Sequence, residues 1–331
     1  MRRPKFWNNK SLLVHILTPI GLIYNFTSKQ RYKLQKPYLS KAPVICVGSP
    51  IIGGGGKTPV VIAIQKLLLK RNKKISAISI AYRGTIKDPV IINKNHTSLE
   101  VGDEPLLLSQ NSDTFVSKKR KDALVAANSY KDYDYIISDD GYRDSSIKNK
   151  INILVIDGNI RPINQKQFPA GDLLGSLDFV LNIADILILV DEEKIEKKLI
   201  KKIRNTKKNC LTAKTEYLIR SNDNSKKIAF TGIGMPEKFF STLKKLNIKT
   251  FQNLTYPNHY QYKTKDVKYL LKIANGHEIF RLLTTSKDYM RLNEVNDPNG
   301  QLREMIDIVD ISIEIDSTEE LMRNISPASI D

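Results

Sequence analysis

The sequence predicts an α/β protein in which helices cover both faces of a mostly parallel sheet, with a second, smaller α/β domain. Short runs of consecutive apolar residues, typical of strands buried on both faces, alternate with longer segments of helical length. A polar, irregular stretch at residues 205–225 interrupts this alternation, and a new strand–turn–helix unit follows it. A chain of 331 residues is long enough for two domains, each with its own core.

Residues 1–40 are expected to form a separate helical segment. Its apolar stretch Leu12–Phe26 is too short and too interrupted for a convincing transmembrane span, and it lacks the small-residue cleavage site of a signal peptide. Basic residues flank the stretch on both sides, and Trp7 precedes it as an interfacial residue. These features suit a helix lying in an anionic membrane surface. A first helix packed on the core fits the sequence equally well.

Residues 41–215 are expected to form the first α/β domain, whose most informative feature is a glycine-rich loop. The strand predicted at residues 43–48 leads into a glycine run and a Lys-Thr pair, and the helix predicted at residues 59–71 follows. The loop residues are Gly53, Gly54, Gly55, Gly56, Lys57 and Thr58. This order is typical of a P-loop, in which backbone N–H groups surround a polyphosphate, the lysine reaches the β- and γ-phosphates, and the hydroxyl binds Mg²⁺. Because Ile51 stands where the strict pattern has glycine, a flexible glycine turn is the alternative.

Two pairs of acidic residues accompany other elements of this domain. Asp139 and Asp140 follow the strand predicted at residues 135–137, at the sheet edge where P-loop enzymes place the carboxylate that organises Mg²⁺. The alternative is a plain strand-to-turn Asp-Gly pair, but the nearby P-loop favours the metal site. Asp103 and Glu104 precede a predicted helix, where capping is the simpler interpretation. Further strands are expected at residues 75–81, 90–92, 151–156 and 186–190.

Residues 216–331 are expected to form the smaller domain, which closes over the active site. His259 stands among aromatic residues, in a loop setting where a lone histidine is usually structural. The segment Thr284–Asp288, with Arg291 nearby, suits either an anion site or an exposed ion pair of Lys287 and Asp288, and we favour the exposed pair. A helix is expected at residues 236–246, and strands are expected at residues 228–230, 250–251, 282–284 and 308–315.

The net charge of +18 favours an anionic partner, and nucleic acid, anionic lipid or a phosphorylated substrate would each satisfy it. Part of the charge lies in Lys194–Lys208, which is expected to form an amphipathic helix with a solvated basic face. The two cysteines, Cys46 and Cys210, lie far apart and indicate neither a disulfide framework nor a zinc site.

Taken together, the ordered motifs resemble the tetraacyldisaccharide 4′-kinase family over nearly the whole chain. The resemblance implies an ATP-dependent kinase that phosphorylates the 4′-hydroxyl of a tetraacylated glucosamine disaccharide 1-phosphate in lipid A biosynthesis. It also implies a peripheral or monotopic protein of the inner membrane, with its catalytic domains on the cytoplasmic face. The segments that carry it are the Trp-containing N-terminus, Val47–Pro59, Arg83-Gly84, Val101–Pro105, Ser138–Gly141, Phe168–Gly171, Phe230–Pro236, Pro257 with His259, and Thr284–Asp288.

The resemblance gives the weaker motifs specific roles. Asp103 and His259 become the candidate dyad that removes the hydroxyl proton. Glu104, Asp139 and Asp140 join Thr58 as candidate metal ligands, and the N-terminal segment becomes the membrane dock. The implied cofactors are ATP and Mg²⁺. The expected partners are the acylated disaccharide phosphate and an anionic membrane surface, with no nucleic acid and no obligate protein partner.

The chain departs from the family pattern at several positions, which concern substrate contacts and the placement of His259: Ser49, Arg143, Asn258 and Tyr260. Two rival functions remain open. One is a P-loop ATPase or GTPase that acts as a switch or assembly factor without a lipid acceptor. The other is a nucleic-acid-binding ATPase, which the charge alone motivates. The sequence lacks an evident Asn-Lys-x-Asp guanine-reading motif and any RNA- or DNA-binding module signature.

Overall fold

The structure is a computed structural model. It describes residues 4–7, 11–34, 36–52, 55–82, 84–160, 162, 164–219, 225–293 and 296–326.

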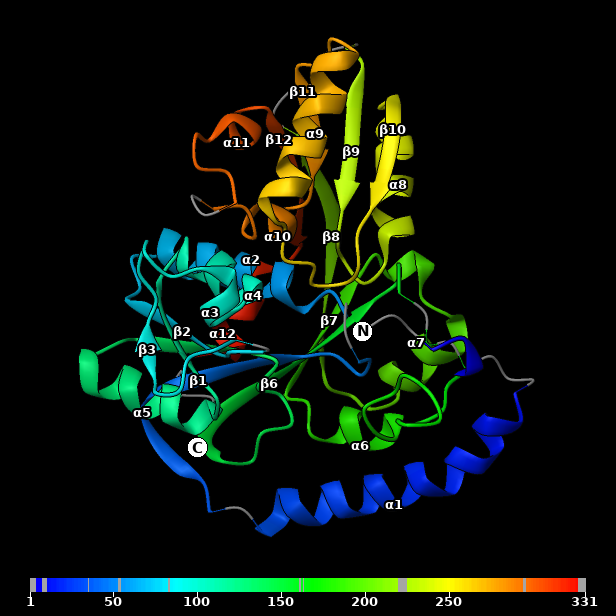
Figure 1. The fold of residues 1–331 in the computed structure, drawn as a ribbon. Helices are drawn as coiled ribbons and strands as arrows, with labels where there is room; N and C mark the ends of the chain where they lie inside the picture. The colour runs from blue at the N-terminus through cyan, green and yellow to red at the C-terminus, as the bar shows by residue number, and fades with distance from the viewer. Residues whose placement is uncertain are drawn as a thin grey trace.

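Twelve strands form one sheet in the order β10-β9-β11-β12-β8-β7-β6-β1-β5-β2-β4-β3 (Figure 1). Neighbouring strands are parallel except for the pairs β8–β12 and β3–β4. The mostly parallel sheet expected from the sequence is therefore confirmed. The strands are β1 (Tyr38–Gly48), β2 (Ile75–Ile80), β3 (Val90–Ile91), β4 (Asp113–Ser117), β5 (Tyr135–Asp139), β6 (Ile147–Asp157), β7 (Ile186–Val190), β8 (Asn209–Ile219), β9 (Lys227–Thr231), β10 (Thr250–Thr255), β11 (Arg281–Thr284) and β12 (Ile306–Ile315).

Helices cover both faces of the sheet, as the buried strands require. Ile45 and Val47 of β1 face the core that holds α2, whereas Val44 and Cys46 face the core that holds α5. The α-helices are α1 (Leu12–Leu34), α2 (Lys57–Lys70), α3 (Ser98–Val101), α4 (Asp103–Ser109), α5 (Arg120–Tyr130), α6 (Leu177–Asn182), α7 (Lys197–Arg204), α8 (Pro236–Lys245), α9 (Thr264–Gly276), α10 (Ser286–Tyr289), α11 (Gln301–Glu304) and α12 (Thr318–Asn324). Two 3₁₀ helices are η1 (Lys5–Trp7) and η2 (Glu192–Lys194).

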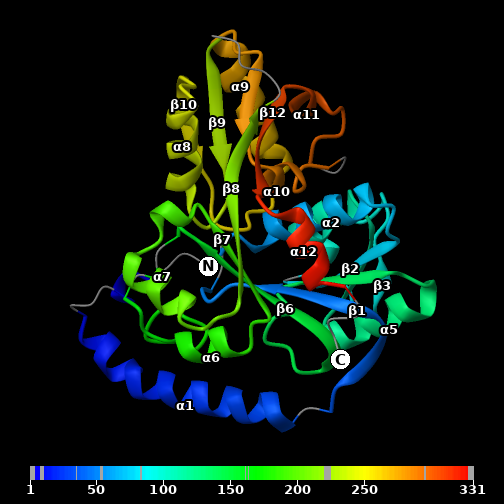
Figure 2. The ribbon, with the colours of Figure 1, turned by 180° about the vertical axis from the view of Figure 1, so that it is seen from behind.

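The chain forms two lobes that β8 and β12 connect (Figures 1 and 2). We call β1–β7 with α2–α7 the P-loop lobe, and β9–β11 with α8–α11 the C-terminal lobe. The expected irregular connection at residues 205–225 is wrong for residues 209–219, which form β8. In β8, Leu211 and Ala213 are buried between more exposed neighbours. This half-exposed alternation makes the strand look like a polar loop in the sequence.

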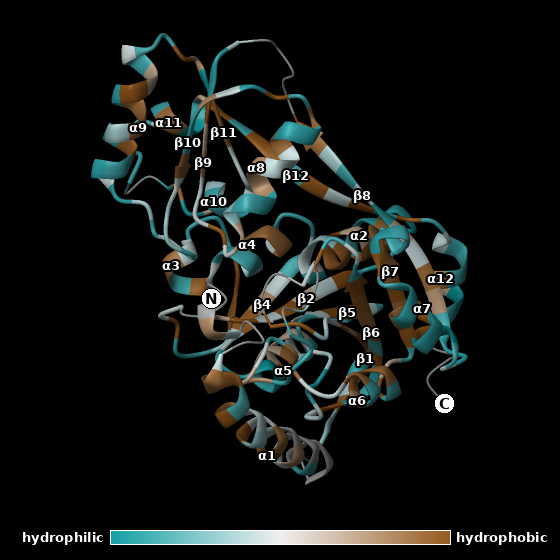
Figure 3. Cartoon of the chain, turned by 90° about the vertical axis from the view of Figure 1, so that its right-hand side faces the viewer, coloured by the Kyte–Doolittle hydropathy of each residue, from teal (hydrophilic) through white to brown (hydrophobic). Residues whose placement is uncertain are grey.

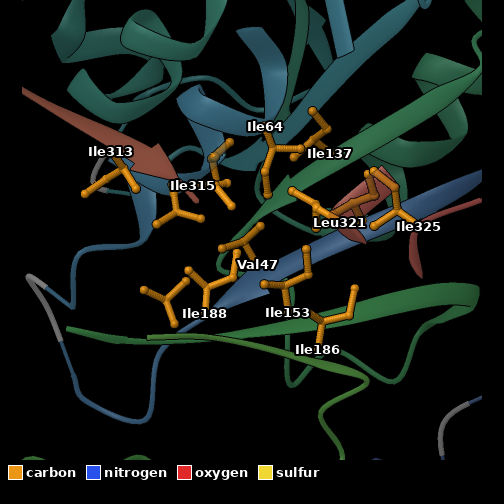
Figure 4. Packing of buried hydrophobic residues seen from close by; sticks show 14 of the residues in the cluster. Val47, Ile64, Ile137, Ile153, Ile186, Ile188, Ile313, Ile315, Leu321 and Ile325 are labelled. Atoms are coloured by element: carbon orange, nitrogen blue, oxygen red, sulfur yellow. The ribbon is translucent and has the colours of Figure 1, made fainter. Parts of the chain in front are cut away.

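The end of the chain returns to the core of the P-loop lobe. Ile313 and Ile315 of β12 and Leu321 and Ile325 at α12 join the cluster that contains Val47 (Figure 4). The C-terminal lobe has its own clusters around β9 and β11. We retain the division at residues 215/216 as a proposal, with the last strand and helix contributing to both parts.

Helix α1 lies along the outside of the P-loop lobe, next to α6 (Figures 1 and 2). Val14 is buried, and a Cβ on Gly21 would lie 3.2 Å from the Gln167 carbonyl oxygen, so this side of the helix packs closely on the lobe. A row of apolar residues on α1 is exposed, namely Leu12, Ile16, Ile20 and Ile23. Figure 3 shows the apolar character of this helix. In the described part of the chain, no helix is both long and apolar enough to cross a membrane.

Trp7 differs from the expectation of an interfacial residue. It is 3% exposed, and its Nε1–H donates a hydrogen bond to the carbonyl oxygen of Pro169 over 2.9 Å. This hydrogen bond satisfies the indole N–H inside the protein. The tryptophan therefore anchors the chain before α1 to the P-loop lobe.

Candidate functional site

The glycine-rich loop connects the carboxyl end of β1 to the start of α2. Gly53 and Gly54, which were predicted to bind the cofactor, lie outside the described residues. A Cβ on Gly55 would fall 2.2 Å from the Ser49 hydroxyl oxygen, and Gly56 has a φ of 73°. Both positions therefore require glycine. At Gly55 and Gly56, no side chain stands in front of the N-terminus of α2, as a phosphate-binding loop needs.

Lys57 is the first residue of α2 and faces the acidic end of β5. Its Nζ lies 3.2 Å from Asp140 Oδ1. Burial lowers the pKa of Lys57, but the charges of Asp140, Asp139 and Glu104 raise it, and the net pKa lies above its ordinary value. The side chain is therefore a charged ammonium at neutral pH. It occupies the position that the lysine of a P-loop sequence has, directly before a Thr at the start of the helix.

Thr58 and Asp139 form a buried pair beside Lys57. Thr58 Oγ1 donates a hydrogen bond to Asp139 Oδ2 over 3.3 Å, while Asp139 Oδ1 is buried without a hydrogen-bond partner among the described residues. Burial, reinforced by the negative charge of Glu104, raises the pKa of Asp139 to about 7. An unpaired carboxylate oxygen next to a P-loop hydroxyl is the donor chemistry that suits Mg²⁺.

The acidic residues do not by themselves complete a metal shell. Within the described ranges, no group of three or more His, Cys, Asp or Glu side chains is arranged to hold a metal ion. Mg²⁺ is usually bound by one or two protein ligands together with water and substrate phosphates. Thr58 and Asp139 therefore fit a magnesium ion that arrives with a nucleotide.

Glu104 forms an acidic cluster with Asp139 and Asp140, but its ion-pair partner belongs to the C-terminal lobe. Its Oε1 lies 2.5 Å from Lys287 Nζ. The charge of Lys287 lowers the pKa of Glu104 even though burial opposes this effect. Because Glu104 also raises the pKa of Asp139, the two carboxylates share one electrostatic environment.

The expected exposed pair of Lys287 and Asp288 is wrong. Asp288 is fully buried, and its Oδ1 lies 2.8 Å from Arg291 Nη1. Successive helical residues point about 100° apart, so Lys287 can reach Glu104 while Asp288 enters the core of its own lobe. The other groups that donate hydrogen bonds to the Asp288 carboxylate are Thr231 Oγ1, the Gly232 N–H, Tyr262 Oη and Thr285 Oγ1.

Asp103 contacts two residues of the C-terminal lobe. Its Oδ1 lies 3.5 Å from His259 Nδ1, and its Oδ2 is paired with Arg291. Burial would raise the pKa of Asp103, but the hydrogen bond with His259 and the charge of Arg291 lower it well below its usual range. The simpler capping interpretation is wrong, because Gly102 is the N-cap of α4 and no side-chain hydrogen bond caps it in the described structure.

His259 is positioned by the loop that follows β10. Its backbone N–H donates to the Gly232 carbonyl oxygen over 2.9 Å, and its φ is 57°. Its ring centroid lies 5.7 Å from that of Tyr82 in the P-loop lobe. The imidazole therefore faces Asp103 across the boundary between the lobes, and its side chain is 24% exposed.

Two charged contacts of this region are not apparent from the sequence pattern. Arg291 is 1% exposed and links Asp103 to Asp288. Lys238 of α8 has its Nζ 3.2 Å from Asp157 Oδ2 at the end of β6. Asp157 follows an apolar run just as Asp139 does, so the rule used for Asp139 would also have found it. The sequence places Arg291 near Thr284–Asp288 but does not reveal its partner Asp103, which is 188 positions away.

The chain matches known proteins over most of its length. The family model described as tetraacyldisaccharide-1-P 4′-kinase matches residues 13–328. A tetraacyldisaccharide 4′-kinase of Rickettsia typhi is 36% identical over 301 residues, covering 88% of this chain and 90% of that protein. The same enzyme of Rickettsia canadensis is 33% identical over 293 residues, covering 88% and 89%.

A solved structure has the same fold. It is a crystal structure of LpxK from Aquifex aeolicus in complex with ATP. The two structures superpose with a TM-score of 0.75 at 23% sequence identity, covering 95% of this chain and 98% of that chain.

Proposed function

Because the chain belongs to the tetraacyldisaccharide-1-P 4′-kinase family, we propose that it transfers the γ-phosphoryl group of ATP to the 4′-hydroxyl of a tetraacylated glucosamine disaccharide 1-phosphate. This reaction would place the protein in lipid A biosynthesis. The observation that carries the proposal is that three groups of residues lie together at one edge of the sheet. They are the P-loop pair Lys57 and Thr58, the carboxylates Asp139 and Glu104, and the contacting pair Asp103 and His259.

The P-loop would hold the triphosphate of ATP. Backbone N–H groups at the start of α2 would contact phosphate oxygens, and Lys57 would leave Asp140 to contact the β- and γ-phosphates. Phosphoryl transfer depends mainly on positioning and on neutralising charge. A charged lysine that already lies at the loop supports this role.

Thr58 and Asp139 would hold Mg²⁺, with Asp140 and Glu104 as neighbouring carboxylates. The unpaired Asp139 Oδ1 supports the choice of Asp139 as the direct ligand. When bound, Mg²⁺ neutralises charge that develops on the phosphate oxygens during transfer.

Asp103 and His259 would act on the acceptor hydroxyl. Asp103 is buried and ionised, so it would orient the imidazole through Nδ1. The other ring nitrogen would accept the proton of the 4′-hydroxyl. The hydroxyl oxygen would then form the new bond to the γ-phosphorus, the bond to the bridging oxygen would break, and ADP would leave.

The position of α1 supports binding at an anionic membrane surface. Its exposed apolar row, Leu12, Ile16, Ile20 and Ile23, would enter the interfacial region, and the net charge of +18 would favour anionic lipids. We therefore place the protein on the inner membrane as a peripheral or monotopic enzyme, with both lobes on the cytoplasmic side.

The proposal is tested by incubating the protein with γ-labelled ATP and a bacterial lipid extract. Label should appear in a chloroform-soluble glycolipid, and Lys57→Ala should abolish this transfer while the unfolding temperature stays near that of the original protein. Release of labelled inorganic phosphate without labelled lipid would instead favour an ATPase that acts as a switch or assembly factor. Transfer by Lys57→Ala at a normal rate would remove the P-loop assignment.

A further inference from the structure

The segment Thr284–Arg291 places a second lysine at the acidic edge of the sheet. Lys287 belongs to α10 in the C-terminal lobe, whereas Lys57 belongs to the P-loop lobe. The buried Asp288 fixes α10, because its carboxylate accepts hydrogen bonds from Gly232 N–H and Tyr262 Oη as well as from Thr285. Lys287 is thus held on a rigid support and extends across the lobe boundary to Glu104.

The contacts of Lys287 parallel those of Lys57. Lys57 Nζ lies 3.2 Å from Asp140, and Lys287 Nζ lies 2.5 Å from Glu104. The two side chains are 13% and 30% exposed, respectively, and both ammonium groups reach the same acidic cluster. The charge of Lys287 also acts on Asp103 and Asp139. Two lysines therefore approach the cluster from opposite lobes.

A purely structural role explains Lys287 less well. Arg291 already joins the lobes through a buried pair with Asp103, so the Lys287–Glu104 pair is not the only ion pair between them. The cluster must instead accommodate a triphosphate next to Asp139, Asp140 and Glu104, where like charges repel. A second lysine would reduce this repulsion together with Lys57 and the Mg²⁺ that accompanies ATP.

Other cations described near this edge have partners of their own. Arg120 pairs with Asp144 and donates a hydrogen bond to the Asp139 carbonyl oxygen, and Arg143 donates one to the Leu174 carbonyl oxygen. Arg291 is 1% exposed and uses both terminal nitrogens on Asp103, Asp288 and the Gly232 carbonyl oxygen. Lys238 contacts Asp157, whose carboxylate lies beside Gly56. Among these cations, Lys287 is the one that contacts Glu104 of the acidic cluster from the C-terminal lobe.

We propose that Lys287 binds the γ-phosphate of ATP from the C-terminal lobe, exchanging its contact with Glu104 for a phosphate oxygen. This inference rests on the proposed kinase function and adds a residue to its donor site. It makes the position of the C-terminal lobe sensitive to the third phosphate, because ADP lacks the group that Lys287 would contact. Lys57 and Lys287 would hold the transferred phosphoryl group from two sides, and such fixed charges stabilise phosphoryl transfer.

The test measures equilibrium binding of Mg²⁺–ATP and Mg²⁺–ADP by calorimetry, without a lipid acceptor. Lys287→Ala should weaken ATP binding by ~10- to 100-fold, the size of one charge-assisted hydrogen bond, and leave ADP binding near its original value. Lys287→Arg should recover part of the ATP affinity. Lys268→Ala, an exposed lysine of α9, is the matched control and should bind both nucleotides normally. If Lys287→Ala is unstable, Lys287→Gln repeats the comparison with a side chain of similar length.

Lys57→Ala separates failure of this inference from failure of the proposed function. Loss of nucleotide binding in Lys57→Ala, with unchanged ATP and ADP affinities in Lys287→Ala, would overturn the role of Lys287 alone. Equal weakening of ATP and ADP by Lys287→Ala would also overturn it, because a γ-phosphate contact discriminates between them. Normal nucleotide binding by Lys57→Ala would instead overturn the P-loop assignment on which both proposals depend.

Discussion

Two adjacent carboxylates at the end of β5 have different environments. Asp139 is the last residue of the strand, is buried, and lies beside Thr58. Asp140 leaves the strand with a φ of 57°, is 56% exposed, and pairs with Lys57. One residue is therefore suited to direct metal binding, and the other to balancing the charge of the P-loop lysine.

We expect Asp139→Asn and Asp140→Asn to reduce activity unequally. Asp139→Asn should lower kcat by ~100-fold or more and raise the Mg²⁺ concentration needed for half-maximal rate, because a metal ion contributes several kcal/mol of charge stabilisation. Asp140→Asn should have a smaller effect. Initial rates across a Mg²⁺ titration measure both, with the exposed Asp132→Asn as the control. Unchanged Mg²⁺ dependence in both variants would mean that the pair is only a turn.

The carboxylate of Asp191 links the end of β7 to η2 and β8. Asp191 accepts hydrogen bonds from Lys194 Nζ over 2.8 Å and from the Thr215 N–H over 3.0 Å. Burial raises the pKa of Asp191, but these hydrogen bonds, with one from Asn159, lower it from 3.8 to about 2. The ionised carboxylate therefore stabilises the contact between the end of β7 and the middle of β8, the strand that links the lobes.

We expect Asp191→Asn to destabilise the protein in a pH-dependent way. A carboxylate whose pKa is lower in the folded state adds stability above its unfolded pKa, and this contribution is lost as the pH falls through its folded pKa. The lowered pKa corresponds to about 2 kcal/mol at pH 7, which should diminish between pH 4 and pH 2. Urea unfolding at several pH values measures it. Asp178→Asn, at a carboxylate that is 72% exposed, is the control. A deficit that is constant with pH would contradict the role of the charge.

Helix α1 shows how one element presents two different surfaces. Its inner side packs through Val14 and Gly21, whereas Leu12, Ile16, Ile20 and Ile23 form the exposed apolar row. A row at this spacing occupies one face of a helix.

We expect the triple variant Ile16→Ser, Ile20→Ser, Ile23→Ser to lose association with anionic vesicles while keeping the unfolding temperature of the original protein. The reason is that these side chains are 56%, 49% and 64% exposed, so they contribute little to the core. Co-sedimentation with phosphatidylglycerol vesicles measures the loss. Phe280→Ser removes an apolar residue of the C-terminal lobe that is even more exposed, at 74%, and this variant should bind normally. Full vesicle binding by the triple variant would place the membrane contact elsewhere.

For the whole molecule, the arrangement of the two lobes decides whether the proposed chemistry is possible. Asp103 belongs to the P-loop lobe, and His259 and Arg291 belong to the C-terminal lobe. The antiparallel pairing of β8 with β12 connects these lobes through two strands rather than one. The dyad therefore depends on the relative position of the lobes.

A double-mutant cycle tests whether Asp103 and His259 act as a unit. Asp103→Asn and His259→Ala should each lower kcat by ~10²–10⁴-fold, the usual contribution of a general acid–base group. The double variant should lose little more than the worse single variant, because the same interaction is removed in each. ATP binding should change little in all three. Losses that multiply in the double variant would show that the two residues act independently.

The glycine-rich loop between a strand and a helix and the parallel strands could be predicted from the sequence alone, because these features depend on neighbouring residues. An apolar run, glycines without Cβ atoms and a Lys-Thr pair are consecutive, and the strand that ends at Asp139 follows the same local rule. The metal role of Asp139 was predicted from its position, and its pairing with Thr58 supports that prediction. The sequence-based catalytic role of Asp103 and His259 came from resemblance and stays a prediction, although the structure brings the two residues together.

The tertiary structure is needed to identify which charged residues are buried and which residues they pair with. In the sequence, Asp288 resembles one member of an exposed ion pair. In the structure, its carboxylate accepts hydrogen bonds from three groups that are distant in sequence and from Thr285, the N-cap residue of α10. The sequence predicts that Trp7 is interfacial, yet its indole N–H donates a hydrogen bond to the carbonyl oxygen of Pro169. Residues 209–219 form a strand because β7 and β12 lie on either side of them. Burial and ion pairing depend on segments that are far apart in the sequence, so local sequence patterns do not reveal them.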